Sequence, residues 1–237
     1  MIIDSHIHAG HADGLTASYT TFEDIATSLE RMDAAGIDGA VVLPIDTTRE
    51  ADEETARIVA EHPGRLWGYS KVHQQRDKGQ VAARLQYAVE KLGLVGLKLH
   101  GLPNREIMTA CDGLGLPVLV DPENHPWGLQ WAAGAYPGVD IIVAHFGSFL
   151  SRSQEAHQQS VWLARKFPNV YLDTSSVMIH SWLEEGVAEC GAEKLIFGSD
   201  GPGIHCGPEL EKVRCLGLSA EDEAKVLGGN IARLCGL

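Results

Sequence analysis

The chain has 237 residues, of which 44% are hydrophobic and 22% are charged, the composition of a globular protein with a buried core. Its formal net charge is −13, so a nucleic-acid backbone and an anionic membrane surface would both be repelled. We therefore expect neither as a partner, whereas a small-molecule substrate, even an anionic one held in a local basic pocket, is compatible with this charge.

The five cysteines are widely spaced and contain no Cys-x-x-Cys pair, which argues against a disulfide framework or a cysteine zinc site. Asp4 and His6 interrupt the apolar start of the chain, so no secretory signal is indicated. No stretch approaches the roughly 18 apolar residues that span a bilayer. The expected location is cytoplasmic, and the oligomeric state is open, with a homodimer as one alternative.

Short apolar runs recur along the chain, and helical patterns lie between them. The runs that predict strands are 2–8, 39–44, 65–72, 94–100, 117–121, 140–145, 169–173 and 194–200. Strands that alternate with helices indicate βαβ units and a parallel sheet. Eight such units in about 240 residues match a closed (β/α)8 barrel, known as a TIM barrel.

The helical segments begin with recognisable signals. Ser219 precedes Asp222 at the spacing of a helix N-cap, and Thr20 and Thr21 stand in the same relation to the acids that follow them. The stretch 78–92 carries its apolar residues along one helical face.

A doubly wound open sheet is the main alternative to a barrel. That fold usually has fewer strands and a phosphate-binding Gly-x-Gly-x-x-Gly loop, and no such loop follows the first predicted strand. We therefore predict an α/β protein with a single TIM-barrel domain over residues 1–237.

The first predicted strand contains the sequence DSHIH, in which Asp4, His6 and His8 occupy alternate positions. Because alternate side chains of a strand point the same way, these three are expected on one face, the barrel interior. Two imidazoles there can bind one divalent metal ion such as zinc. The pattern alone is weak evidence, since a histidine near an apolar run is more often structural.

Four other predicted strands end in side chains that bind metals or move protons, namely His100, Asp121, His145 and Asp200. TIM barrels carry their active sites at the carboxyl ends of the strands. One such residue is most simply the polar start of a loop. Four of them, together with the histidine pair, predict an active site.

Four segments resemble the amidohydrolase superfamily: DSHIH at the start, AHFG at 144–147, FGSDGP at 197–202 and the closing KVLGGNIARL. The resemblance extends over residues 2–235. More narrowly, it is to the branch called amidohydrolase family 2, the metal-dependent hydrolases of TIM-barrel fold. The combination of motifs is specific, although each motif alone is not.

This resemblance implies one divalent metal ion, with zinc expected and manganese as the alternative. His6 and His8 would be ligands, and Asp200 would be both a ligand and the carboxylate that transfers a proton. His145 would be a second catalytic histidine, either as a ligand or as a group that polarises the substrate.

The chain departs from the family pattern on the fifth predicted strand, where Asp121 stands in place of the usual histidine ligand. A carboxylate can bind zinc, so Asp121 is expected to be a ligand. His125, in the following loop, is the alternative if that loop folds back. The departure also leaves open a weakly bound or absent metal.

Substrate contacts are expected from Lys98, His100, His125 and Arg152. As a cation in a water-poor barrel interior, Lys98 can hold a substrate carboxylate, and its alternative role is a structural ion pair with an acid such as Asp4. The predicted mouth loops contain further cationic or titratable side chains, and they favour an anionic group on the substrate: Arg49, His73, Arg76 and Arg152.

The resulting functional prediction is a hydrolase, in which metal-activated water attacks an ester, lactone or amide bond and Asp200 transfers the proton. A metal-dependent decarboxylase of an aromatic or unsaturated carboxylic acid is the first alternative, because family 2 also contains such lyases. The shortness of the chain, close to a bare barrel, favours hydrolysis over decarboxylation. A non-catalytic barrel that only binds a ligand is the second alternative.

Overall fold

In the computed structural model, residues 1–11 and 22–237 are described, and their strands form one sheet. Eight parallel strands follow one another in chain order: β1 (Ile3–His11), β3 (Gly39–Pro44), β4 (Leu66–Lys71), β5 (Gly96–His100), β6 (Val118–Asp121), β7 (Ile141–Val143), β8 (Val170–Asp173) and β9 (Leu195–Ile196). The short β2 (Phe22–Glu23) lies antiparallel beside β1.

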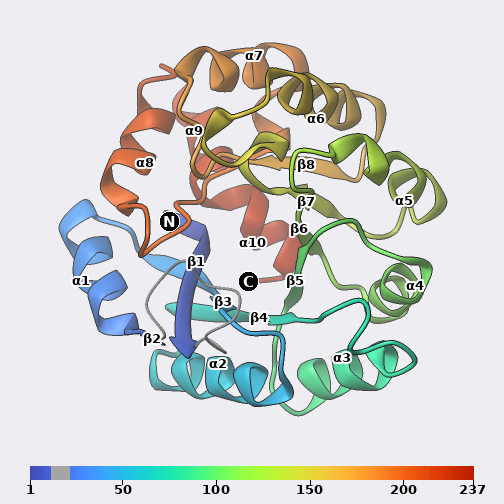
Figure 1. Cartoon of the computed structure of the whole chain (residues 1–237). Coiled ribbons are helices and arrows are strands. Elements are labelled where there is room, and N and C mark those ends of the chain that lie inside the picture. Colours follow the sequence, from blue (N-terminus) through green and yellow to red (C-terminus); the bar gives the residue numbers. More distant parts are fainter. Residues whose placement is uncertain (12–21) are drawn as a thin grey trace.

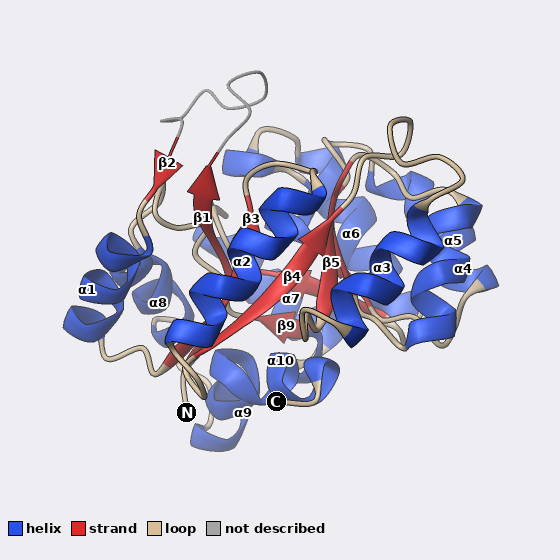
Figure 2. Cartoon of the chain, turned by 90° about the horizontal axis from the view of Figure 1, so that it is seen from below, coloured by secondary structure: helices blue, strands red, loops and turns tan. Residues whose placement is uncertain are grey.

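The sheet closes on itself between the segment that follows β9 and β1. The Asp200 amide donates to the His6 carbonyl at 2.7 Å, and the His8 amide donates to the Gly201 carbonyl at 2.6 Å. Figures 1 and 2 show the strands enclosed by a ring of helices. The predicted α/β TIM barrel is confirmed.

The helices lie on the outside of the barrel. Their bounds are α1 (Ile25–Ala35), α2 (Arg49–Glu61), α3 (Val81–Glu90), α4 (Arg105–Leu114), α5 (Gln130–Ala135), α6 (Gln154–Lys166), α7 (His180–Cys190), α8 (Cys206–Arg214), α9 (Ala220–Ala224) and α10 (Asn230–Cys235). Among residues 1–11 and 22–237, every helix is too short or too polar to cross a lipid bilayer.

The core has an inner and an outer layer because strand side chains alternate between the barrel interior and the helices. On β3, Val41 belongs to the inner cluster and Val42 to the outer one. Ile231 and Leu234 of α10 join the inner cluster, so this helix covers the amino-terminal end of the barrel (Figure 2). The carboxyl ends of the strands are left as the end that can hold a site.

A register shift changes one prediction about β1. Between Asp4 and Ile7 the pairing with β3 slips, so Ile3 packs in the inner cluster and Ile7 in the outer one. The alternation predicted that Asp4 shares the face of His6 and His8. Because of the register shift, it does not. Its Oδ1 instead accepts from the Ser199 amide at 2.9 Å, next to the seam of the barrel.

Two predicted strands are shorter than expected. The run 140–145 stops at Val143, because His145 and Phe146 adopt left-handed φ angles of 56° and 50°. The run 194–200 pairs with β8 only over Leu195–Ile196, after which its backbone groups bond to β1. In both places the chain leaves the sheet where the candidate site begins.

The helix starts follow local capping. The Ser219 hydroxyl accepts from the Asp222 amide, as predicted. Asp24 caps α1 by accepting from the Ala26 amide at 3.0 Å. Thr20 and Thr21, which were expected to start this helix, lie outside the described residues.

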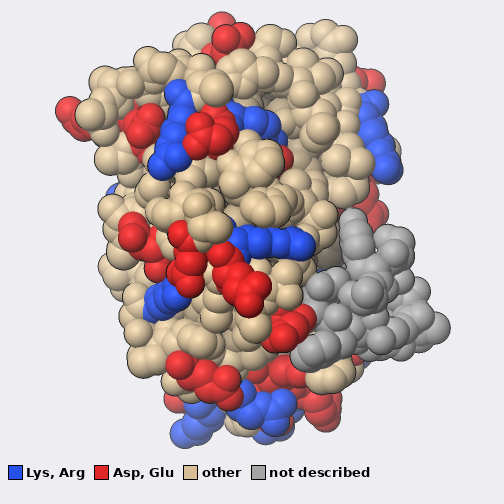
Figure 3. Space-filling view, turned by 90° about the vertical axis from the view of Figure 1, so that its left-hand side faces the viewer, with Lys and Arg blue, Asp and Glu red and all other residues tan. Residues whose placement is uncertain are grey.

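Figure 3 shows the side of the molecule that carries α1 and α8. Acidic and basic side chains are interspersed over the described part of this face, without a continuous basic area.

Candidate active site

A cavity of about 530 Å³ lies at the carboxyl ends of the strands. Its walls come from nearly every strand end, so it gathers side chains that are far apart in the sequence. The lining residues are His6, His8, Ile45, Asp46, Thr47, Lys71, His73, Arg76, Lys98, His100, Asp121, Glu123, His145, Phe149, Asp200, Gly201, Pro202 and Gly203.

His6, His8 and Asp200 form a compact group on the floor of this cavity. The Asp200 Oδ1 lies 3.4 Å from His6 Nε2 and 3.2 Å from His8 Nε2. Their potential ligand atoms all lie within 4.8 Å of one another. Two imidazole nitrogens and a carboxylate oxygen at this separation suit a first-row divalent ion.

Asp173, at the end of β8, orients His6. Its Oδ2 lies 2.9 Å from His6 Nδ1, and both side chains are fully buried. A carboxylate on one imidazole nitrogen fixes the ring and leaves the other nitrogen free for a metal. Asp173 was not among the predicted site residues, although the run 169–173 ends in this acid, just as 117–121 ends in Asp121.

The protonation states of the group suit cation binding. Burial lowers the pKa of both His6 and His8 below the ordinary value. Burial alone would raise the pKa of Asp200, but the facing imidazoles of His6 and His8 outweigh it and hold that pKa well below its ordinary value. Neutral imidazoles and an ionised carboxylate are the forms that bind metal ions.

His145 reaches the same group from the turn after β7. Its ring stacks on His6, with centroids 5.1 Å apart. Its Nδ1 lies 3.2 Å from the Ser175 carbonyl oxygen and 2.9 and 2.8 Å from the hydroxyls of Ser175 and Ser176. A carbonyl oxygen only accepts, so Nδ1 carries the hydrogen, and the neutral ring has its acceptor at Nε2.

Lys98 borders the histidine pair from β5. Its ammonium nitrogen is buried and lies 3.3 Å from His6 Nε2, the nitrogen that an ion would use. Burial lowers the pKa of Lys98, and the carboxylates of Asp121, Asp200 and Asp173 oppose that shift. Asp4 is not the acid that pairs with Lys98, because its Oδ1 accepts from the His6 and Ser199 amides, and the alternative of a structural pair with another acid stays a prediction.

Asp121 and His100 are neighbours across β5 and β6, and both line the cavity. Among the described residues, two groups of side chains are close enough to share an ion, His6 with His8 and Asp200, and His6 with His145 and Asp173, and Asp121 belongs to neither. Its Oδ1 accepts from the Glu123 amide at 2.9 Å. Its role as a ligand stays a prediction.

His125 and Arg152 lie outside the cavity lining. His125 is exposed at the start of a short 3-10 turn, Pro126–Leu129. Arg152 is also exposed, and its guanidinium lies 5.5 Å from the ring of Phe149, which does line the cavity. Substrate contact by these two residues therefore stays a prediction. Lys71 and Asp46, which were not predicted, do line the cavity.

A family model described as amidohydrolase matches residues 3–237. The chain belongs to this amidohydrolase family. The four sequence segments that resembled amidohydrolase family 2 therefore identified the family correctly, and the barrel places three of them, DSHIH, AHFG and FGSDGP, around one cavity.

Relatives of this chain include a gamma-resorcylate decarboxylase from Polaromonas sp. strain JS666. It is 24% identical in an alignment, gaps included, of 248 positions that covers 80% of this chain and 76% of the relative. The structure of a dihydroxybenzoic acid decarboxylase from Polaromonas sp. JS666, with bound manganese and the inhibitor 2-nitroresorcinol, has a TM-score of 0.78 and 18% identity, covering 100% of this chain and 97% of that one. An amidohydrolase structure from Burkholderia multivorans has a TM-score of 0.81 and 17% identity, covering 100% and 99%.

These comparisons contradict the hydrolase prediction. The curated relative is named as a decarboxylase, as are several structural neighbours. The motifs behind the prediction supply the histidines and the carboxylate on the floor of the cavity, and these residues do not distinguish water attack from loss of CO₂. Chain length, which favoured hydrolysis, says nothing about bond chemistry. The alternative of a decarboxylase is the better supported.

Proposed function

We propose that this chain is a metal-dependent decarboxylase of hydroxylated aromatic carboxylic acids. The observation that carries the proposal is the match to a gamma-resorcylate decarboxylase over 80% of the chain. The cavity supports it, because His6, His8 and Asp200 lie close enough together to share a cation beside Lys98. Such a floor suits an anionic substrate in an otherwise acidic protein.

His6, His8 and Asp200 are the residues proposed to hold the metal, and Asp121 is a further ligand candidate. The donor set of two imidazoles and a carboxylate fits zinc and manganese alike. Manganese is the ion named in the Polaromonas structure. When bound, a divalent ion would supply the positive charge that holds the substrate carboxylate and a neighbouring hydroxyl oxygen.

Three side chains are proposed to orient the substrate. Lys98 is a buried cation next to His6, where it can hold an anionic oxygen. His145 offers its Nε2 as an acceptor for a ring hydroxyl. His100 lines the cavity beside Asp121 and is proposed to contact the ring. Phe149 supplies an apolar surface in the same wall.

Asp200 is proposed to carry the proton. Decarboxylation breaks the bond between the ring carbon and the carboxylate, releases CO₂ and leaves an electron pair on that carbon. A proton must take the place of the lost group. Asp200 takes one proton from solvent and delivers it to the ring carbon; because His6 and His8 favour its ionised form, the transiently protonated carboxyl gives up that proton readily and is ionised again at the end of the cycle.

The direct test is turnover of 2,6-dihydroxybenzoate, the acid also called gamma-resorcylate, by protein loaded with manganese or zinc. We expect resorcinol as the product, measured by liquid chromatography, with benzoate unchanged because it lacks the hydroxyls. Chelation should abolish turnover, and added metal should restore it. Absence of product from every ortho-hydroxy aromatic acid tested, with metal bound, would contradict the proposal.

A second expected result concerns Asp173. Asp173→Asn keeps the size of the side chain but weakens its interaction with His6 Nδ1, so metal affinity should fall by about 10–100-fold. Competition with a chromogenic chelator measures this affinity. Asp46→Asn, at a cavity carboxylate outside both candidate ion groups of the described residues, is the matched control. Equal affinity in Asp173→Asn and wild type would show that Asp173 does not orient a ligand.

A further inference from the structure

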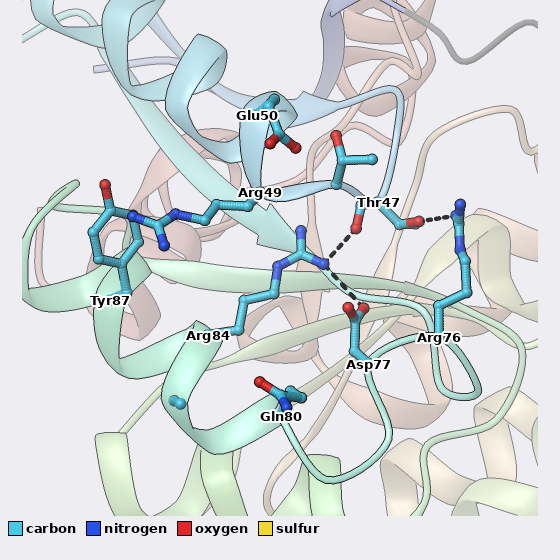
Figure 4. A pocket seen from close by; sticks show the side chains of 10 residues that line it. Thr47, Arg49, Glu50, Arg76, Asp77, Gln80, Arg84 and Tyr87 are labelled. Carbon is cyan, nitrogen blue, oxygen red and sulfur yellow. Dashed lines mark hydrogen bonds and ion pairs between the residues drawn. The ribbon is translucent and has the colours of Figure 1, made fainter.

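A second cavity, of about 440 Å³, lies beside the first and shares Thr47 and Arg76 with it. Figure 4 shows Arg84, from α3, reaching across this space to Thr47 and Asp77. The Arg84 side chain is only 9% exposed, although α3 lies on the outside of the barrel. Burying a charge costs free energy unless ion-pair and hydrogen-bond partners compensate for it. The partners of this buried guanidinium therefore indicate what it does outside the active-site cavity.

Arg84 joins segments that follow two neighbouring strands. Its Nη1 donates to the Thr47 carbonyl oxygen, in the loop after β3. Its Nη2 donates to the Lys71 carbonyl oxygen at 2.9 Å, where β4 ends. Its Nη1 also lies 2.9 Å from Asp77 Oδ2, in the loop after β4. Arg84 thus holds the loop after β3, the end of β4 and the loop after β4 at fixed separations.

The partners of Arg84 extend this network. Asp77 Oδ2 also accepts from the His73 amide at 2.6 Å. Asp52 lies 3.1 Å from Arg84 Nη2, and its other carboxylate oxygen accepts from the Lys71 amide at 3.1 Å. The amide and the carbonyl of Lys71 are therefore both tied to the Arg84 cluster.

The loop after β3, the end of β4 and the loop after β4, which Arg84 joins, form one wall of the active-site cavity. Lys71, His73 and Arg76 line it from the end of β4 and the loop that follows, and Asp46 and Thr47 line it from the loop after β3. The two loops also meet directly, since the Lys71 ammonium donates to the Ile45 carbonyl at 2.6 Å and Arg76 donates to the Thr47 hydroxyl. None of the Arg84 atoms lines that cavity.

We propose that Arg84 is a positioning residue for substrate binding, acting through the wall formed by Asp46, Thr47, Lys71, His73 and Arg76. A planar guanidinium presents five donors in a rigid fork and reaches several acceptors at once, whereas a lysine ammonium presents three donors at one point. Arg84→Lys therefore keeps the positive charge beside Asp52 but loses the donors that fix the distance between the loop after β3 and the loop after β4. A misplacement of about 1 Å can cost up to about 10²-fold in a site.

The inference rests on the proposed function only through the substrate used to measure KM and kcat. The binding of a ligand that does not react, 2-nitroresorcinol, is therefore measured as well. The variants are Arg84→Lys and Asp77→Ala, the second of which removes the contact with Arg84 and the acceptor of the His73 amide from a less buried position. Arg49→Met is the matched control. Arg49 was expected in a mouth loop, but it begins α2, lies outside the active-site lining, and lines the second cavity, where it pairs with Glu53 and Tyr87 on the outer helices. The readouts are the Kd of 2-nitroresorcinol for metal-loaded protein, and KM and kcat for 2,6-dihydroxybenzoate.

We expect Arg84→Lys to raise the Kd and the KM about tenfold, with a change in kcat below about threefold and unchanged metal content. Asp77→Ala should shift the same quantities less, and Arg49→Met should leave them within about twofold of wild type. A lowered melting temperature with unchanged Kd and KM would overturn the inference, because it would leave Arg84 a purely structural role. If wild type binds 2-nitroresorcinol without decarboxylating the substrate, and Arg84→Lys weakens that binding, the proposed function fails while the inference stands.

Discussion

Asp200→Asn is expected to slow decarboxylation of 2,6-dihydroxybenzoate by about 10²–10⁴-fold, the usual cost of losing a general acid or base. Asparagine retains one oxygen that can face His6 and His8, but its amide cannot carry a proton to the ring carbon. The variant should therefore keep a substantial share of its metal while it loses turnover. Steady-state rates and metal analysis on the same preparation measure both quantities.

Asparagine is the suitable replacement at this position because Asp200 has a left-handed φ of 63°. Asparagine tolerates that backbone conformation better than alanine does, so strain does not confound the result. Glu123→Gln is a matched control, because Glu123 lines the same cavity, also has a left-handed φ, of 51°, and is assigned no part in substrate binding or proton transfer. Turnover by Asp200→Asn close to the wild-type rate, with metal retained, would remove Asp200 from the proton-transfer role.

His8→Ala is expected to lose stoichiometric metal. Its Nε2 lies 3.2 Å from Asp200 Oδ1, so it supplies one of the three ligand atoms in the candidate site. Removing a ligand should cost more affinity than the about 10–100-fold expected for a residue that only orients one. The His8 side chain is 21% exposed, so its truncation should leave the fold intact, as circular dichroism can verify.

His100→Ala provides the control for this experiment. His100 lines the same cavity but lies in neither candidate ion group of the described residues. Inductively coupled plasma mass spectrometry of the purified variants should find metal in His100→Ala and little in His8→Ala. Full metal content in both variants would place the ion elsewhere in the cavity.

Much of the fold was predictable because it depends on local patterns. The apolar run 39–44 is buried along its whole length as β3, as expected of a parallel strand covered on both sides. The pairing of His6 with His8 followed from strand alternation. The register shift after Asp4 was not predictable, because it arises from pairing with β3 rather than from the β1 sequence.

The site was predictable only where its residues end a strand of recognisable sequence. Asp200, His145 and His100 were found in this way, and Asp173 was missed although it follows the same rule. Arg84 carried no comparable signal. It lies within a helix, and its partners come from four other segments that only the folded barrel brings together.

The reaction was harder to predict than the site. Imidazoles and a carboxylate around one ion can activate water or hold a substrate carboxylate, and the same residues serve both chemistries. The choice between them depends on which substrate the cavity walls admit. Those walls come from loops whose positions depend on tertiary contacts such as the one between Lys71 and Ile45.

The most direct test of the decarboxylase proposal follows the carboxyl carbon itself. Metal-loaded protein is incubated with 2,6-dihydroxybenzoate labelled with ¹³C at the carboxyl group, in D₂O, and the products are followed by nuclear magnetic resonance. The account predicts that the label appears as CO₂ and bicarbonate and that resorcinol carries deuterium at the vacated ring carbon. Label that stays on the ring, while the same preparation hydrolyses esters or lactones, would contradict it.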